Sequence, residues 1–131
     1  MGAFDMLGIA RSSLTTHQTW LDALSHNIAN ANTVRSTDES AFQAQYVMAE
    51  AQEAGGVRVS GLALGDPEGR MVHNPDHPLA DENGYVRMPD VDMAAQMGQL
   101  IMAQRGFQAQ TSVVRNAQDV YSSALSIGRN A

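Results

Sequence analysis

A short segment in the middle of the chain holds four side chains that could bind a metal ion: His73, Asp76, His77 and Asp81. Imidazole nitrogens and carboxylate oxygens are common zinc ligands, so such a site could serve a small metal-dependent enzyme. Pro75 and Pro78 interrupt the segment, and the His-x₃-His spacing therefore does not place both rings on one helix face. We expect an ordinary polar loop here, with no metal ion and no other cofactor.

The chain also lacks residues that several other kinds of catalysis need. It contains no cysteine and no lysine, which excludes a thiol nucleophile, a Schiff-base lysine and the lysine of a phosphate-binding loop. Serine, histidine and aspartate are all present, but the G-x-S-x-G motif that exposes a hydrolase nucleophile does not occur. We predict that the chain has no catalytic residue and is not an enzyme.

The acidic charge of the chain lies almost entirely in its middle. The net charge is −6, yet residues 38–92 carry eleven acids against three arginines, whereas residues 1–37 sum to zero and residues 93–131 to +2. No basic patch could replace the counterions of phosphate groups, so nucleic acid is not an expected partner. No apolar run is long enough to span a bilayer, and no cleavable secretory signal is visible, so we expect no direct membrane insertion.

The first element that the sequence predicts is a long helix over residues 4–32, with Asp5 as its N-cap and a stop near Asn32. Apolar residues recur every seven positions along this helix, and Leu24 lies between two of these positions. This is the spacing of a coiled-coil face. This N-terminal seam comprises Leu7, Leu14, Leu21, Leu24 and Ile28. A seam this narrow cannot bury itself and needs another helix.

The middle of the chain predicts a small, turn-rich β region. Alternating apolar residues favour a strand over residues 42–49, where a helix also remains open, and further short strands over residues 57–64, 70–73 and 85–88. A β-bulge at Gly61 would let the second strand continue to Leu64. Gly55-Gly56, Asp66–Gly69 and Asn83-Gly84 supply the turns between these strands.

A second long helix is predicted from Asp90, as its N-cap, to Gly128, as its C-cap. Its apolar stripe again recurs every seven residues, and the C-terminal seam comprises Met93, Met97, Leu100, Phe107, Val114, Tyr121 and Leu125. Two seams at opposite ends of one chain indicate that the ends pair with each other.

The predicted fold class is therefore mainly α, with two long terminal helices forming a coiled-coil-like layer and a small β-rich region between them. We divide the chain into residues 1–33, the N-terminal helix of that layer, residues 34–89, the β region, and residues 90–131, the C-terminal helix. The length of 131 residues suits a single domain. The two seams could also form a simple antiparallel hairpin within a monomer.

Two blocks of the sequence resemble the flagellar rod and hook protein family. The first closes the N-terminal helix and matches the family pattern S-x-N-[IL]-A-N-[AV]-x-T at Ser25, Asn27, Ile28, Ala29, Asn30, Ala31 and Thr33. The second runs from His77 to Asp92 and is similar to the short proximal rod proteins of that family, with the characteristic residues Asn83, Gly84, Tyr85 and Pro89. Phe107 and Gln110 depart from the family, which usually has tyrosine and asparagine there.

This resemblance implies a structural subunit of the periplasm-spanning rod in the flagellar basal body, which assembles helically and transmits motor torque. The implied partners are further copies of the chain, other rod proteins, membrane-ring or adaptor proteins at the rod base, and the flagellar type III export apparatus. The seams would then be subunit-packing surfaces. Another rod protein or an export-linked adaptor is an alternative within the same structural class. A small metal-dependent enzyme is an alternative of a different class, and a metal assay on pure protein would distinguish it from a structural protein. Asn27, Asn30 and Asn32 either terminate the helix or bond neighbouring subunits.

Overall fold

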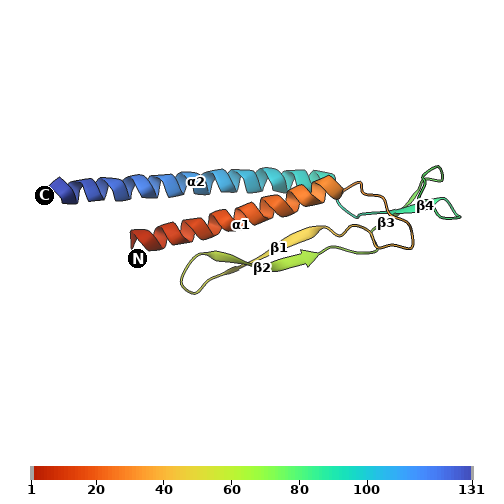
Figure 1. Ribbon diagram of the computed structural model, residues 1–131, viewed down its shortest axis with the longest axis horizontal. Helices are drawn as coiled ribbons and strands as arrows, with labels where there is room; N and C mark the ends of the chain where they lie inside the picture. The colour runs from red at the N-terminus through yellow and green to blue at the C-terminus, as the bar shows by residue number, and fades with distance from the viewer. Residues whose placement is uncertain (1, 131) are drawn as a thin grey trace.

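The computed structural model describes the chain from Gly2 to Asn130, with nothing described for the side chain of Ala3. Its elements follow in the order α1 (Ala3–Asn30), β1 (Gln45–Ala51), β2 (Val57–Leu64), β3 (Arg70–His73), β4 (Tyr85–Met88) and α2 (Met93–Asn130). The molecule is elongated, and α1 and α2 run antiparallel side by side (Figure 1). This arrangement fits the predicted mainly α class with two long terminal helices and a small β-rich region between them, and the structure adds that the strands pair antiparallel.

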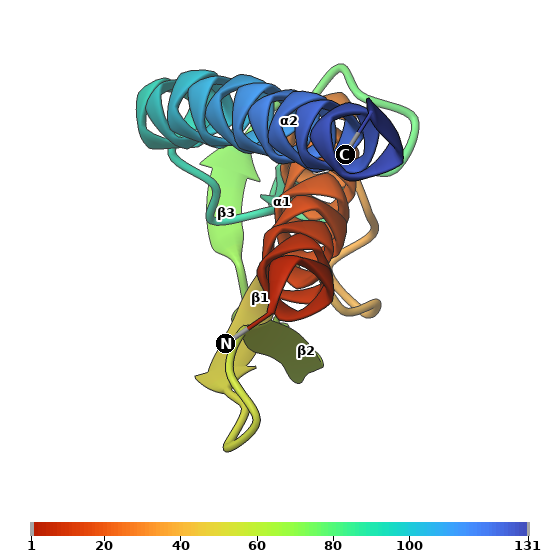
Figure 2. The same ribbon diagram turned by 90° about the vertical axis from the view of Figure 1, so that its left-hand side faces the viewer.

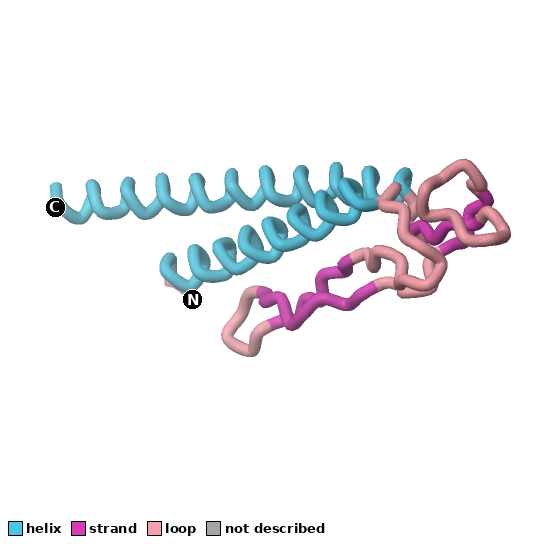
Figure 3. Tube along the Cα trace, turned by 45° about the vertical axis from the view of Figure 1, so that its right-hand side comes forward, coloured by secondary structure: helices cyan, strands magenta, loops and turns pink. Residues whose placement is uncertain are grey.

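The elements form three layers, with α1 in the middle. Viewed end-on, α2 lies on one side of α1 and the β1–β2 hairpin on the other (Figure 2). The strands β3 and β4 and their loops lie at the end of the molecule opposite both chain termini (Figure 3). Helix α1 therefore needs two packing faces, whereas the sequence predicted a single seam.

Helix α1 begins at Ala3, three residues earlier than an N-cap at Asp5 would allow. Gly2 occupies the N-cap position, and Asp5 lies in the first turn, where its carboxylate accepts a hydrogen bond of 2.9 Å from the Gly2 N–H. Asp5 is thus not the N-cap, although a carboxylate in the first turn still stabilises the positive end of the helix dipole. The helix ends at Asn30, near the predicted stop.

Helix α2 starts later and ends later than the sequence indicated. Asp92, not Asp90, caps it, because the Asp92 Oδ1 atom accepts the N–H groups of Ala94 and Ala95 at 3.0 and 3.2 Å. Gly128 is not a C-cap, since the helix continues through it to Asn130. With 38 residues, α2 is about 57 Å long, whereas the 28 residues of α1 span about 42 Å. The last turns of α2 extend beyond the start of α1 (Figure 1).

The β1–β2 hairpin is antiparallel and carries the irregularity expected near Gly61. Its register shifts between Met48 and Ala49, where Met48 pairs with Gly61 and Ala49 with Val59. Strand β1 begins at Gln45, three residues after the predicted start. The hairpin tip is held on α1 by Ser12, whose hydroxyl accepts the Val57 N–H at 3.1 Å and donates to the Ile9 carbonyl at 2.7 Å.

The predicted strands over residues 70–73 and 85–88 form the second antiparallel pair, β3–β4. The Arg87 backbone also pairs with Arg35, so the segment after α1 lies beside β4. The Arg87 side chain donates to the carbonyl of Thr37 at 2.9 Å and forms an ion pair with Glu68 at 3.2 Å. Gly84 permits the tight turn into β4, because its φ of 79° favours glycine and a Cβ would press against Pro75.

The core of the described chain consists mostly of small side chains. The buried apolar residues are Ala10, Ala23, Leu24, Ala31, Ala41, Ala44, Val86 and Ala103. Alanine buries little apolar area, so this core contributes less stabilisation than one of leucine and phenylalanine would. Two amide side chains, Asn27 and Gln96, are buried with it.

Candidate functional site

The residues of the two predicted seams separate into an internal and an exposed group. Within the described chain, Leu24 is buried, and a larger set is half-buried: Leu7, Leu14, Leu21, Ile28, Leu100, Phe107, Val114 and Tyr121. Met93, Met97 and Leu125 are exposed. One chain therefore covers only part of these seams.

The helices are in tight contact where His17 meets Gly106. A Cβ atom on Gly106 would overlap the imidazole of His17, so only glycine fits there without a shift. The Nδ1 atom of His17 lies 2.8 Å from the Ser13 carbonyl oxygen, to which it donates, and this bond holds the ring against α2. The sequence did not single out Gly106.

Asn27 joins three elements that are far apart in the sequence. Its Nδ2 group donates to the Gln45 carbonyl at 2.9 Å and to Gln96 Oε1 at 3.0 Å, and its Oδ1 atom accepts the Gln45 N–H at 2.7 Å. Both interpretations drawn from the sequence thus differ from what is seen, because Asn27 neither ends the helix nor lies on the surface. Asn30 does lie at the helix end, where its Nδ2 group donates to the His26 carbonyl at 2.9 Å.

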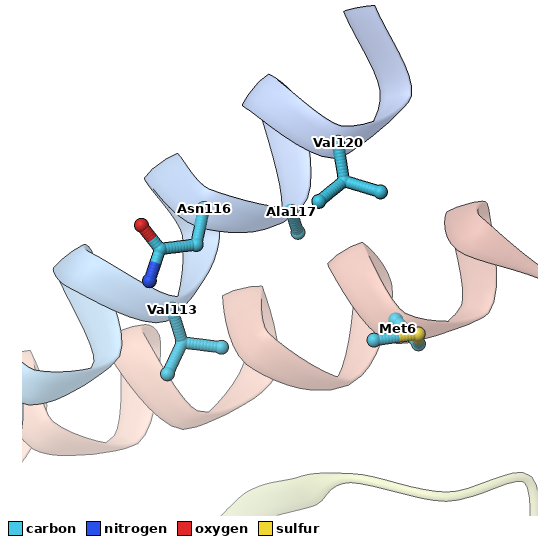
Figure 4. Close-up of a pocket in the computed structure, with 5 residues that line it drawn as sticks. All are labelled: Met6, Val113, Asn116, Ala117 and Val120. Atoms are coloured by element: carbon cyan, nitrogen blue, oxygen red, sulfur yellow. The ribbon is translucent and has the colours of Figure 1, made fainter. Parts of the chain in front are cut away.

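An apolar groove lies between the start of α1 and the second half of α2. It has a volume of about 280 Å³, and Met6, Val113, Asn116, Ala117 and Val120 line it (Figure 4). Close by, the rings of Phe4 and Tyr121 meet edge to face with their centroids 5.4 Å apart.

Large apolar side chains remain exposed over much of the outer surface. On α2 they are Met93, Met97, Ile101, Met102, Val113, Val120, Leu125 and Ile127. On the hairpin they are Tyr46, Met48, Leu62 and Leu64. So many exposed apolar side chains on so small a protein are typical of a surface that contacts other proteins.

The loop with the four candidate metal ligands uses most of them in its own structure. The His77 Nδ1 atom accepts the Leu79 N–H at 3.1 Å, and the His73 ring packs on Tyr85 with centroids 5.0 Å apart. Asp81 Oδ1 accepts the N–H groups of Asn83 and Tyr85, both at 2.9 Å. From Gly2 to Asn130, no three His, Asp or Glu side chains are grouped so that they could hold a metal ion.

The pKa of the Asp81 carboxyl lies below its ordinary value of 3.8. The hydrogen bond from the Tyr85 N–H is the largest cause, and burial opposes it.

Within residues 2–130, neither helix is both long and apolar enough to cross a membrane.

Comparison with known proteins supports the resemblance seen in the sequence. Residues 7–35 match the family described as flagella basal body rod protein, and residues 82–127 match the flagellar basal body rod FlgEFG protein C-terminal family. The flagellar basal-body rod protein FlgC of Salmonella typhimurium is 31% identical, over 98% of this chain and 100% of the relative. FlgC of Yersinia enterocolitica is 34% identical and that of Bacillus subtilis 27%, each over 98% of this chain and 100% of the relative.

The chain belongs to the FlgC family of flagellar basal-body rod proteins.

The residue ranges that match the two rod-protein families include the residues that form the contacts between α1 and α2 described above. The range 7–35 includes His17 and Asn27, and the range 82–127 includes Gln96 and Gly106. Sequence reasoning missed Gln96 and Gly106, because a polar residue and a glycine do not belong to an apolar stripe. A possible signal for Gln96 was its position seven residues before Ala103, which places both on one helix face.

The remaining motif residues shape the ends of the elements. Ala31 is buried, Thr33 is half-buried and bonds Asn30 Oδ1 at 3.3 Å, and Ser25 and Ala29 are exposed. In the second block, Gly84 and Pro89 are buried, whereas Asn83 and Tyr85 are exposed. The first block, residues 25–33, thus forms the end of α1. The second block, residues 77–92, forms the turn and the strand β4 that lead into α2.

Proposed function

We propose that the chain is a subunit of the proximal rod, in which its two terminal helices pack against those of neighbouring rod subunits and so help to transmit motor torque. Family membership makes the chain a structural subunit of the flagellar basal-body rod and places it in the flagellar basal body. The helical packing, the proximal position and the role in torque are the parts that we propose.

The observation that carries this proposal is the apolar surface that a single chain leaves uncovered. Met93, Met97 and Leu125 belong to the C-terminal seam by spacing, yet all three are exposed. In the coiled-coil-like layer that we propose, helices of adjacent subunits would cover these residues. Methionine suits such contacts, because its unbranched side chain adapts to neighbours of different shape.

The three regions of the chain would have different positions in this rod. Residues 1–33 and 90–131 would form the inner helical layer, and residues 34–89, which hold most of the acidic side chains, would lie outside it. A tube of closely packed helices suits torque transmission, because packed interiors deform little.

Other rod proteins and further copies of the chain are the partners that we propose for the exposed seam. Membrane-ring or adaptor proteins at the rod base, and the type III export apparatus that would deliver the chain unfolded to the periplasm, complete the set. Neither nucleic acid nor direct insertion into a membrane is part of this function, and we expect no cofactor.

Site-specific photocrosslinking in motile cells tests the proposal. A photoreactive residue at Met97 should crosslink to a rod protein, identified by mass spectrometry, in isolated basal bodies. The matched control carries the same residue at Asp66, in the acidic middle of the chain, and should give far less of that product. If the Met97 variant is present in basal bodies but crosslinks to no rod protein, the exposed seam is not a subunit contact.

A further inference from the structure

The side chain of Asn27 binds the first residue of β1 as a neighbouring strand would. It accepts the Gln45 N–H at 2.7 Å and donates to the Gln45 carbonyl at 2.9 Å, so both backbone groups of that residue are satisfied by one amide. A helix side chain thereby substitutes for a strand at the point where β1 begins. This contact fixes the start of β1 on α1, because Gln45 has no other hydrogen-bond partner on α1 within residues 2–130.

The second proton of the same amide group is bound by α2. Asn27 Nδ2 donates to Gln96 Oε1 at 3.0 Å, and the two side chains are 0% and 4% exposed. Within residues 2–130, α2 packs on α1 but on neither strand of the hairpin. The Asn27 amide is therefore the hydrogen-bonded connection between α2 and the hairpin.

We propose that Asn27 is a positioning residue that couples the packing of α2 on α1 to the placement of the β1–β2 hairpin. With α2 in place, water is excluded and all three hydrogen bonds of the amide are formed in a buried setting, where such bonds are stronger. When α2 leaves, one Nδ2 proton loses its acceptor, and water can reach the pair with Gln45. The start of β1 then loses its fixed position on α1, and the hairpin stays attached at its tip through Ser12.

This coupling does not depend on the proposed function, since it concerns contacts within one chain. It would matter for assembly, because the exposed hairpin residues Tyr46, Met48, Leu62 and Leu64 would reach their positions only when the two terminal helices are packed. A subunit whose helices are still apart would not present this surface.

Amide hydrogen exchange on the full-length chain tests the coupling directly, because the Gln45 N–H donates to Asn27. The variant Gln96→Met keeps the length of the side chain and removes the acceptor, and within residues 2–130 it lies on a helix that packs on neither strand of the hairpin. At a protein concentration where α2 is protected, the Gln45 N–H and the β1–β2 pairs should exchange about tenfold faster in this variant, since a buried donor is left unpaired.

The control is Gln110→Met, two heptads further along the same helix and half-buried. It should leave exchange in the hairpin unchanged. The coupling is overturned if Gln96→Met accelerates exchange only in the first turn of α2, or equally throughout the chain. It is also overturned if conditions are found in which the hairpin stays protected while both helices exchange freely.

Replacement of Asn27 by leucine, which has a similar shape, gives a second test that does not depend on exchange in α2. Asn27→Leu removes all three hydrogen bonds, including the one to Gln96, so adding Gln96→Met to it should change hairpin exchange little further. Full additivity of the two substitutions would contradict the coupling, because two independent contacts add their effects.

Discussion

At the scale of single residues, the absence of a side chain at Gly106 decides how closely the helices approach. The imidazole of His17 occupies the space that a Cβ would fill, and its bond to the Ser13 carbonyl keeps it there. Protein interiors are packed closely enough that one additional carbon atom at such a contact forces a shift.

Gly106→Ala should therefore destabilise the packing of α1 on α2 by about 1–3 kcal/mol, despite the better helix propensity of alanine. The measurement is thermal unfolding, followed by circular dichroism at a concentration that supports assembly. Gly98→Ala is the matched control, because among residues 2–130 no atom other than those of its chain neighbours and the surrounding helix backbone lies within 4 Å of a Cβ added there. It should be neutral or stabilise the helix by up to about 1 kcal/mol. Equal effects of the two substitutions would show that the His17 contact does not limit helix approach.

A second residue-scale feature is the carboxylate that organises the turn before β4. The N–H of Tyr85 contributes most to lowering the Asp81 pKa, and the N–H groups of Asn83 and Gly84 and the Thr37 side chain act in the same direction. Because the pKa of the folded state lies below the ordinary value, the carboxylate stabilises the turn above pH 3.8. That stabilisation is lost as the pH falls through the lowered pKa.

We expect the amide N–H resonances of Asn83 and Tyr85 to titrate below pH 3.8, as their acceptor becomes protonated. The measurement is a series of NMR spectra over the acidic range. Asp81→Asn should abolish this titration, and Asp76→Asn, in the same loop, should preserve it. A midpoint at or above pH 3.8 would mean that the hydrogen bonds do not favour the charged form.

At the scale of elements, the exposed turns of α2 distinguish the two helices. Helix α1 is covered on two sides, by α2 and by the hairpin. Among the helices and strands of residues 2–130, α2 contacts only α1, and it extends past the first turn of α1. Half-buried residues such as Leu100 lie at the margin of this contact, so a neighbouring helix could complete their burial.

Leu100→Asp should abolish rod assembly and swimming while leaving export of the chain intact. Burying an unpaired carboxylate beside apolar neighbours is costly, or requires the group to become neutral, and every subunit in a helical assembly would carry the same defect. Export of an unfolded chain should not be affected. The measurement is a motility assay with secreted protein quantified in the same cells.

The control for this substitution is Asp66→Asn, an exposed position where a change of charge typically alters stability by no more than about 0.5 kcal/mol. Normal swimming of the Leu100→Asp cells would show that the C-terminal seam is not an assembly contact. Degradation is checked in the same samples, since loss of swimming reports on assembly only when the variant protein is present.

At the scale of the whole molecule, a long shape is combined with a thin core. Most buried apolar residues are alanine, and most of the last two turns of α2 have no partner within the described chain. Helix formation by itself is marginal in water and depends on packing of an apolar face. The isolated chain has little apolar burial to offset the entropy that ordering two long helices costs.

Amide exchange should accordingly show α1 and α2 to be weakly protected in the dilute, unassembled protein and strongly protected in isolated basal bodies. Dilution is the internal comparison, since only contacts between subunits depend on concentration. Strong protection along both helices in a dilute monomer would contradict this expectation. By the coupling through Asn27, the hairpin should change its protection together with the helices.

The sequence by itself determined the elements and the family. Heptad spacing predicted both long helices, alternation and turn residues predicted the short strands β3 and β4, and two motifs indicated the rod proteins. These features are local, because periodicity, turn chemistry and short motifs depend on residues that are near one another in the chain. Helix ends were less predictable, since Asp90 and Asp92 are equally good caps and only the backbone geometry distinguishes them.

Only the tertiary structure decided which residues from distant segments meet. The contacts of Asn27 span 18 and 69 residues of sequence, and neither Gln45 nor Gln96 is an apolar residue of the stripes that predicted the elements. The second packing face of α1 was hidden for the same reason, because its hairpin contacts involve serine and glycine rather than an apolar stripe. Close approach and buried polar pairing depend on where backbones cross in space, and that is set by the packing of the whole chain.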